Sequence, residues 1–269
     1  MQPEHYRVDP AHKLRLGHWN TGDDGGLTRE TAEARTENFT RELQDWQARL
    51  YAENRQSLLI VLQARDAGGK DGTVKHVFSG LNPQGVRVTS FKVPSAEEAA
   101  HDFLWRVHPH APATGQVAIF NRSHYEDVLV PRAHGSLKGA AAKQRLGHIR
   151  DFESLLSVRG TRVLKFYLHI SPDEQLARLR ERVREPDKRW KFNPGDLEER
   201  ARWDAYTEAY QQALRLTATD EAPWYVVPAD HKWFRNLLIS QVIVETLRDM
   251  DPQLPPADFD PAEMERQLK

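Results

Sequence analysis

The chain alternates between short apolar runs and longer segments in which apolar residues recur with helical spacing. Its clearest helical stripe, between residues 28 and 54, consists of Phe39, Leu43, Trp46 and Leu50. These residues follow one another at intervals of three or four, which predicts one long amphipathic helix. The next run, SLLIVLQA (57–64), is apolar almost throughout and has polar flanks. Such a run is typical of a strand that is buried on both faces of a sheet.

The same alternation continues along the chain. Further strands are predicted at GVRVTSFKV (85–93), QVAIFN (116–121), TRVLKFYLHI (161–170) and APWYVVPA (222–229). Helices are predicted at 95–107, 138–160, 171–183, 197–216 and 231–248. Ser95 with Glu98, and Ser171 with Glu174, have the spacing of capping boxes. Strands separated by helices predict a mainly parallel sheet covered on both faces, which is an α/β fold with three layers.

No internal repeat or linker divides the chain, so a single domain is expected. We expect an N-terminal arm at residues 1–27, the domain at 28–250 and a C-terminal tail at 251–269. A segment of about 178–195 contains Pro186 and the triplet Asn193-Pro194-Gly195, which end a helix in a loop. Loops of this kind close over phosphates in kinases, so the segment is interpreted as a helical lid.

Composition limits the possible partners and compartment. The 269 residues include 38 Lys or Arg and 39 Asp or Glu, which gives a formal net charge of -1. A polyanion therefore has to meet local basic patches, because the chain has no global positive field. The absence of cysteine excludes disulfides and thiolate metal sites. With no apolar run of membrane-spanning length and no apolar signal core at the N-terminus, we expect a cytoplasmic protein without a membrane partner.

The stretch after the first strand has the pattern of a phosphate-binding loop. A buried strand, a Gly-rich turn and a helix direct backbone N–H groups and a helix dipole at an anion. The usual sequence is G-x-x-x-x-G-K-[ST], whereas this chain has Ala64 at the first position and Asp71 after Gly69-Lys70. Asp66 lies inside the turn, where its charge would oppose a phosphate unless a cation lay between them. Mg²⁺ would meet that need, and Mn²⁺ could replace it.

A second group of candidates follows the strand 116–121. Asn121-Arg122 comes directly after this strand, and Glu126-Asp127 follows soon after. Ligands of open parallel sheets bind beyond the carboxyl ends of the strands. Asp127, or with less support Glu126, is therefore the expected second metal ligand, and Arg122 a clamp on phosphoryl oxygens. The alternative is a surface loop that merely contains charged residues.

Basic residues concentrate in two segments. Between Asp127 and Asp151 no acidic residue interrupts Arg132, Lys138, Lys143, Arg145 and Arg150. The second segment contains Arg178, Arg180, Arg182, Arg184, Lys188, Arg189 and Lys191. For any single arginine a solvated helix surface is the simpler interpretation. Two such segments in a chain of net charge -1 favour a track for a polyanion.

Together these stretches resemble the family-2 polyphosphate kinases, which are P-loop enzymes. The resemblance extends from about residue 28 to 247 and depends on ARDAGGKDGT, FNRSHYEDVLV, DLEERARWDAY, APWYVVPADHKW and the segment with Pro186, Lys188, Trp190 and Lys191. The family's loop reads A-x-D-x-x-G-K-x-G, which Ala64 and Asp71 fit. The resemblance implies a P-loop kinase fold. It also implies that the Asp66 carboxylate replaces the usual serine or threonine at the metal.

The resemblance also implies roles for individual residues. Asp66 and Asp127 would bind Mg²⁺, while Lys70 and Arg122 would contact the phosphoryl group. The residues predicted to bind phosphate are Gly68, Gly69, Gly72, Thr73, Lys75, Lys138, Arg178 and Arg182. Those predicted to bind nucleotide are Asp71, Asn121 and Glu126. Many relatives read F-D-R-S-W-Y-N where this chain has FNRSHYE. The variant with Asn121 and Glu126 resembles the branch that accepts both AMP and ADP.

The predicted activity is reversible, Mg²⁺-dependent phosphoryl transfer from polyphosphate to AMP and ADP, with ATP as a product and guanine nucleotides as further substrates. An oligomer of identical chains, a dimer or tetramer, is expected. One alternative is an ATP-dependent nucleoside monophosphate kinase with the same loop. Another is a non-catalytic binder of polyanions or nucleic acid, which would survive loss of Asp66 and which we do not favour.

Overall fold

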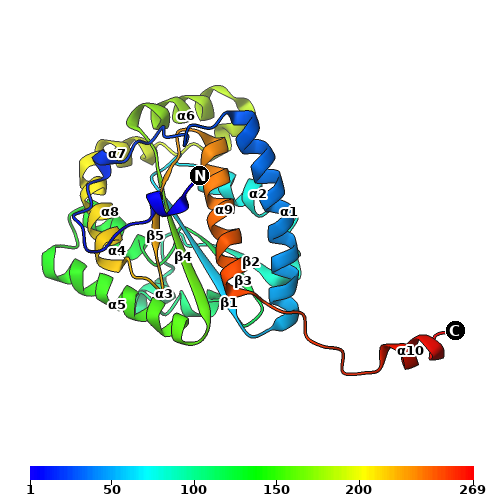
Figure 1. The fold of residues 1–269 in the computed structure, drawn as a ribbon. Coiled ribbons are helices and arrows are strands. Elements are labelled where there is room, and N and C mark those ends of the chain that lie inside the picture. Colours follow the sequence, from blue (N-terminus) through cyan, green and yellow to red (C-terminus); the bar gives the residue numbers. More distant parts are fainter.

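A computed structural model describes all 269 residues of the chain. Its centre is a five-stranded sheet in the order β2-β3-β1-β4-β5, in which every neighbouring pair is parallel (Figure 1). The strands are Ser57–Ala64 (β1), Val86–Ser90 (β2), Val117–Asn121 (β3), Thr161–His169 (β4) and Trp224–Pro228 (β5). All residues of β1 are buried, since it lies between β3 and β4, whereas the edge strand β2 is largely accessible.

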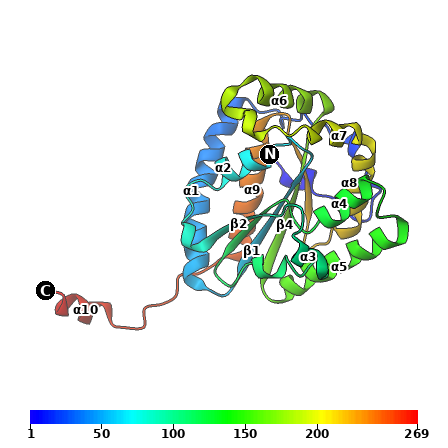
Figure 2. The same ribbon diagram turned by 180° about the vertical axis from the view of Figure 1, so that it is seen from behind.

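Ten α-helices accompany the sheet. They are Arg29–Glu53 (α1), Lys70–Val77 (α2), Ala96–Ala100 (α3), Glu126–Ala133 (α4), Gly139–Val158 (α5), Pro172–Arg184 (α6), Gly195–Ala201 (α7), Trp203–Thr217 (α8), Lys232–Met250 (α9) and Pro261–Gln267 (α10). Helices α1 and α9 cover one face of the sheet, and α4, α5 and α8 cover the other (Figures 1 and 2). This arrangement confirms the predicted three-layer α/β/α fold with a mainly parallel sheet.

Each face of the sheet contributes to its own hydrophobic core. On the first face, Leu43 and Leu50 of the predicted stripe belong to the same buried cluster as Leu238 and Val242 of α9. Phe39 and Trp46 pack at the margin of this core. Burying such side chains provides about 25 cal/mol for each Å² of apolar surface. The apolar stripes that predicted the helices are therefore the surfaces that form the cores.

Several predicted elements differ from the observed ones in length. The segment 95–107 forms helix only at Ala96–Ala100, because the Asp102 carboxylate accepts the N–H groups of Leu104 and Trp105 and closes a turn. The capping box of Ser95 and Glu98 is present as predicted. The segment 197–216 is two helices, α7 and α8, that meet at Arg202.

Two further helical features differ from the sequence analysis. No helix was predicted directly after β3, yet Glu126–Ala133 is helical and even includes Pro131. The box predicted at Ser171 is half formed, because Ser171 accepts the N–H of Glu174 but the Glu174 carboxylate pairs with Arg178. An arginine one turn along offers a charged donor, which is a stronger partner than a backbone N–H.

The segments outside the sheet follow different courses. In the N-terminal 27 residues, Tyr6, Val8 and Leu16 are buried in the two cores, and Arg7 forms an antiparallel bridge with Tyr225 of β5. At the other end, α10 lies apart from the body of the protein at the end of an extended segment (Figures 1 and 2). The division of the chain into an arm at 1–27, a domain at 28–250 and a tail at 251–269 stays a prediction.

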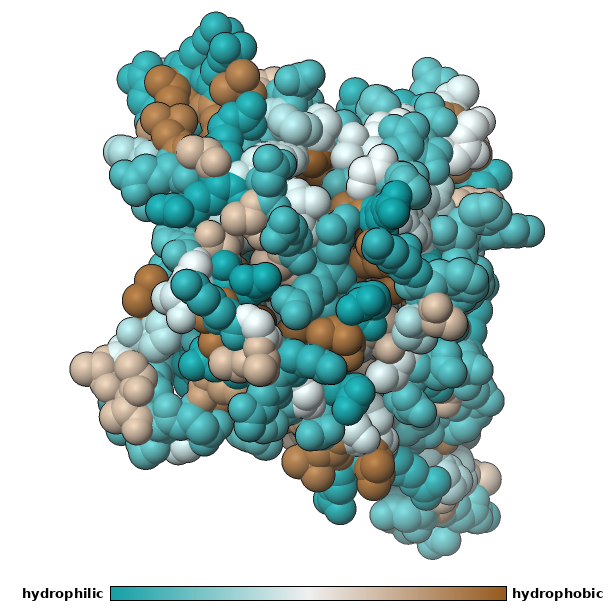
Figure 3. Space-filling model, turned by 90° about the vertical axis from the view of Figure 1, so that its left-hand side faces the viewer, coloured by the Kyte–Doolittle hydropathy of each residue, from teal (hydrophilic) through white to brown (hydrophobic).

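The outer surface is largely polar. The face that includes α5 and α8 is mostly hydrophilic, and its hydrophobic residues form small separate groups (Figure 3). None of the helices combines the length and the apolar character that crossing a lipid bilayer requires.

Candidate active site

The turn between β1 and α2 allows only small residues at its centre. A Cβ atom on Gly68 would lie 2.6 Å from the Cβ of Ala64 and 2.9 Å from the carbonyl oxygen of Arg65. Gly69 has a φ of +103°, and a Cβ there would lie 2.0 Å from Nη1 of Arg235. The chain thus curls tightly before α2 begins at Lys70, so the free N–H groups of the first helical turn adjoin the turn. This is the geometry of an anion-binding helix N-terminus, as predicted from the sequence.

The turn after β3 lies beside the glycine turn, because β1 and β3 are neighbours with Leu62 paired to Asn121. Arg122 has a φ of 63°, an unusual value for a residue with a side chain. Nη2 of Arg122 lies 3.2 Å from Oδ1 of Asp66. Two turns that are distant in the sequence therefore bring a cation and a carboxylate together.

Burial shifts the acid–base properties of two groups here. The Lys70 ammonium donates to the carbonyl of Ala64 at 2.9 Å, and burial together with the nearby Arg122 cation lowers the pKa of Lys70. Burial raises the pKa of the Glu126 carboxyl, although the Arg122 and Lys70 cations oppose this change. Perturbed pairs of this kind are common in functional sites.

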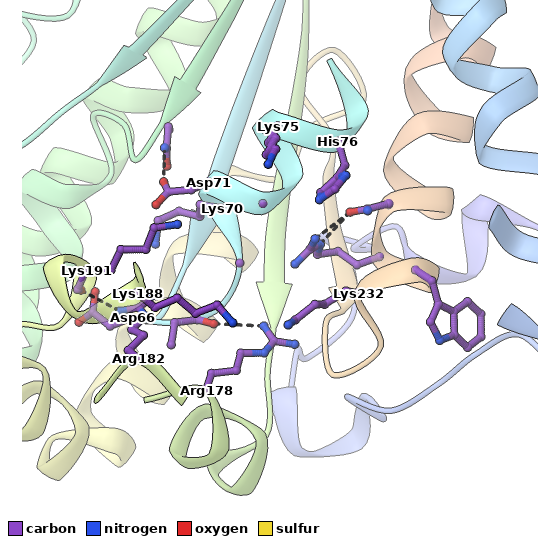
Figure 4. Close-up of a pocket in the computed structure, with 18 of the residues that line it drawn as sticks. Asp66, Lys70, Asp71, Lys75, His76, Arg178, Arg182, Lys188, Lys191 and Lys232 are labelled. Carbon is purple, nitrogen blue, oxygen red and sulfur yellow. Dashed lines mark hydrogen bonds between the residues drawn. The ribbon is translucent and has the colours of Figure 1, made fainter. Parts of the chain in front are cut away.

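A cavity of about 1810 Å³ opens over the glycine turn. Twelve Lys or Arg residues line it against seven Asp or Glu, although the whole chain has a net charge of -1. Figure 4 shows that these side chains converge from α2, the α6 segment and α9, with Arg178, Arg182, Lys188 and Lys191 on the side of α6. Lys75, Lys191 and Lys232 have no carboxylate within ion-pair distance. The cavity therefore suits an extended polyanion.

A second cavity of about 460 Å³ adjoins the first. Aromatic side chains form part of its wall, namely Phe91, Trp203, Tyr206 and Tyr210. The guanidinium of Arg65 lies 3.8 Å from the ring centroid of Trp203 and holds this wall in position. The two cavities share six lining residues, which are Asp66, Lys92, Val93, Arg122, Asn193 and Asp196. Asp66 and Arg122 thus face both spaces.

The structure brings most of the predicted residues together. Those that line the larger cavity are Asp66, Gly68, Gly69, Lys70, Asp71, Gly72, Lys75, Asn121, Arg122, Arg178 and Arg182. Asp71 and Asn121 are joined by a hydrogen bond of 2.8 Å, whereas Glu126, the third residue predicted to bind nucleotide, lines the smaller cavity. The three residues therefore do not form one group.

Three other predicted residues lie apart from the larger cavity. Thr73 is buried and its hydroxyl donates to the carbonyl of Gly69. Lys138 is exposed before α5 and lines neither cavity. Asp127 lines only the smaller cavity, where its carboxylate lies 2.8 Å from Arg106, a buried residue. Their predicted roles gain no support from these positions.

Sequence reasoning missed several residues of the site. Arg106 was assigned to a helix and Arg235 to the final helix, while Asp196 lies between the predicted lid and the helix that follows it. Burial and the nearby Asp66 carboxylate raise the pKa of Asp196, which lines both cavities. A polar residue in an apolar stripe, such as Arg235 next to Phe234 and Leu237, was the only available signal. Long-range packing, which spacing does not report, determined all three positions.

The carboxylates permit a partial metal site. No group of three or more His, Cys, Asp or Glu side chains has the geometry to hold a metal ion. Asp66 and Asp196, however, face the same spaces, and the repulsion that raises the pKa of Asp196 would be relieved by a cation between them. Mg²⁺ is usually bound by one or two carboxylates, with water and substrate phosphates as the other ligands. The donor set fits an ion of that kind.

Comparison with known proteins gives a consistent result. The sequence model of a family described as "Polyphosphate kinase 2 (PPK2)" matches residues 26–255. The chain is 50% identical to an AMP/ADP-polyphosphate phosphotransferase of Meiothermus ruber over 93% of this chain and 94% of the relative. It is 42% identical to an ADP-polyphosphate phosphotransferase of Rhodopseudomonas palustris, over 95% and 93%. The crystal structure of polyphosphate kinase 2 from Arthrobacter aurescens superimposes with a TM-score of 0.96 at 40% identity, over 100% and 96%.

Proposed function

The chain belongs to the polyphosphate kinase 2 family, and on that premise we propose that it transfers the terminal phosphoryl group of polyphosphate to AMP and ADP. One observation carries the proposal. A basic cavity and a cavity with an aromatic wall meet at Asp66 and Arg122, beside the glycine turn. The first suits a phosphate chain, and the second suits a nucleoside, whose base can stack on Trp203, Tyr206 or Tyr210.

The reaction exchanges one phosphoanhydride bond for another. An ionised phosphate oxygen of the nucleotide attacks the terminal phosphorus, and the shortened polyphosphate leaves with the electron pair of the broken bond. The attacking oxygen is already ionised, so a general base is not needed, and the transfer is reversible. The main obstacle is repulsion between two polyanions. Arg122 and Lys70 offset that repulsion, and each such donor contributes about 10² or more to the rate.

Mg²⁺, with Mn²⁺ as a substitute, is the proposed cofactor. Asp66 would hold it, with the predicted Asp127 or the neighbouring Asp196 as the second carboxylate. When bound, the ion would supply positive charge that screens the phosphate oxygens from one another. Asp196 is favoured for this task because it lines both cavities with Asp66, whereas Asp127 lines only the smaller one. The contact of Asp196 with Arg182, at 3.4 Å, is also longer than the 2.8 Å pair of Asp127 with Arg106.

The remaining aspects of the predicted biology belong to the same proposal. AMP, ADP and ATP are the proposed nucleotide substrates and products, with guanine nucleotides as further substrates. The named relatives support AMP and ADP. We also propose an oligomer of identical chains and a cytoplasmic location, which the absence of cysteine supports.

The test is a transfer assay analysed by chromatography. Purified protein is incubated with Mg²⁺, AMP and polyphosphate, and in parallel with ATP in place of polyphosphate. Formation of ADP and then ATP only when polyphosphate is present supports the proposal, and excess EDTA should stop it. Failure to form ADP with polyphosphate, together with efficient conversion of AMP by ATP, would instead indicate a nucleoside monophosphate kinase.

A further inference from the structure

Arg235 is a buried cation without an acidic partner. It lies in the first turn of α9 and exposes only 2% of its surface. Its Nε and Nη2 atoms donate to Oδ1 of Asn236 at 3.1 and 2.8 Å, and it takes part in none of the ion pairs of the chain. Burial and the nearby Arg178 cation lower the pKa of Arg235 to about 9, so it is still charged at neutral pH. Burying an uncompensated charge is costly, which calls for a reason.

The free end of this side chain faces the glycine turn. A Cβ on Gly69 would lie 2.0 Å from Nη1 of Arg235 and 3.4 Å from Nη1 of Arg178. Nη1 of Arg235 has no hydrogen-bond partner within the protein, and the residue lines the larger cavity. The Asp230 carboxylate, which also lines this cavity, accepts hydrogen bonds from Thr21 and Ser171 and forms none with Arg235. Two guanidinium groups therefore flank the same glycine.

The neighbouring Arg178 is better compensated. It pairs with Glu174 at 2.7 Å and donates to the carbonyl of Ala67 at 3.1 Å. Figure 4 shows Arg178 on the α6 side of the cavity and Lys232 on the α9 side. A phosphate group that reaches the glycine turn between α6 and α9 would find Nη1 of Arg235 without a protein partner. Guanidinium groups bind phosphate oxygens through short charge-assisted hydrogen bonds.

We propose that Arg235, together with Arg178, forms an anchor for a phosphate group of the polyphosphate chain. Both residues line the larger cavity and neither lines the smaller one. The anchor therefore acts on the donor chain and not on the nucleotide. This assignment rests on the proposed function, which identifies the larger cavity with polyphosphate. The missing negative partner of Arg235 is then the substrate itself.

This role has a distinctive consequence for stability. An arginine retained for ligand binding makes the ligand-free protein less stable than an apolar residue of similar length would. An arginine retained for structure has the opposite effect. Arg235→Met should therefore leave the ligand-free melting temperature unchanged or raise it. The variant should also lose most of the stabilisation that added polyphosphate gives the parent protein.

The experiment compares Arg235→Met and Arg235→Lys with the parent protein. A matched control is Arg159→Met, because Arg159 is exposed at the end of α5 and lines neither cavity. Calorimetry measures the affinity for linear polyphosphate without nucleotide and for AMP without polyphosphate, and thermal unfolding is recorded with and without polyphosphate. We expect Arg235→Met to bind polyphosphate at least tenfold more weakly with unchanged affinity for AMP. Arg235→Lys should keep part of the affinity, and the control should match the parent protein.

Two outcomes would overturn the anchor. One is an unchanged affinity of Arg235→Met for polyphosphate. The other is a lower ligand-free melting temperature with equal loss of both affinities, which would show that Arg235 is structural. The proposed function fails separately, if the parent protein binds polyphosphate but transfers no phosphoryl group. In that case the affinities still test the anchor.

Discussion

At the scale of single residues, Asp66 combines two tasks in one carboxylate. It lies 3.2 Å from Arg122 and faces both cavities, so it can orient that arginine and hold a cation. Its side chain lies in a turn and is 26% exposed, so the fold does not depend on its charge.

Asp66→Asn should therefore reduce phosphoryl transfer by about 10² or more without unfolding the protein. Removal of the charge weakens both the orientation of Arg122 and the binding of a cation. Turnover measured with polyphosphate and AMP tests this, with circular dichroism as the check on folding. Asp151→Asn, on the exposed side of α5, is the matched control. Parent-like turnover of Asp66→Asn would remove this residue from the mechanism.

Lys70 should produce opposite pH effects on stability and on binding. Because its pKa is lowered in the folded protein, the unfolded chain binds this proton more tightly. Stability attributable to Lys70 therefore rises as the pH increases from the folded towards the unfolded pKa. Phosphate binding weakens over the same range, because the positive charge is lost.

Comparing the parent protein with Lys70→Met at each pH separates the effects of Lys70 on stability and on phosphate binding from those of other groups that titrate at high pH. Melting temperatures and polyphosphate affinities are measured between pH 7 and 10. With rising pH, the loss of stability that Lys70 causes relative to Lys70→Met should become smaller. The higher affinity of the parent protein for polyphosphate should become smaller as well. A pH-independent difference in both quantities would contradict the assignment.

At the scale of elements, a buried polar network fixes the turn that contains Arg122. Glu153 of α5 accepts hydrogen bonds from Tyr125, at 2.8 Å, and from Lys165 of β4. Nε2 of His124 lies 3.2 Å from the same carboxylate, and Lys165 also donates to the carbonyl of Thr217. His124 and Tyr125 follow Arg122 by two and three residues, so the network connects α5 and β4 to the turn that contains Arg122.

Glu153→Gln should destabilise the protein by about 3–5 kcal/mol, because it leaves the buried Lys165 charge without its counter-ion. Chemical denaturation measures the free energy of unfolding. The double variant Glu153→Met with Lys165→Met should recover most of the loss, since no unpaired charge remains. Equal instability of the double and single variants would show that packing, and not charge, dominates here.

At the scale of the whole molecule, two cavities that share one wall allow both substrates to bind together. Direct transfer across Asp66 and Arg122 then needs no phosphorylated enzyme. Initial rates over a grid of AMP and polyphosphate concentrations should therefore give intersecting reciprocal plots. Parallel plots, or a phosphorylated chain detected by mass spectrometry after incubation with polyphosphate alone, would indicate a covalent intermediate and contradict this arrangement.

Much of the molecule was predictable from local sequence. The apolar run of β1 and the stripe of Leu43 and Leu50 determine where a strand and a helix form, because burial follows their periodicity. The glycine turn with Lys70 was also predictable, since Gly68 and Gly69 have no room for a side chain. The short α3 and the break at Arg202 were not, because local turns there compete with the helix.

The sequence by itself determined the parallel α/β order, the phosphate-binding turn and the concentration of basic residues, because each depends on neighbours in the chain. Tertiary structure alone decided that Arg106 pairs with Asp127, that Asp196 adjoins Asp66 and that Arg235 lies over Gly69. These contacts join segments that are distant in sequence, and their partners are set by the packing of helices against the sheet. The spacing of residues along the chain does not show how the helices pack against the sheet.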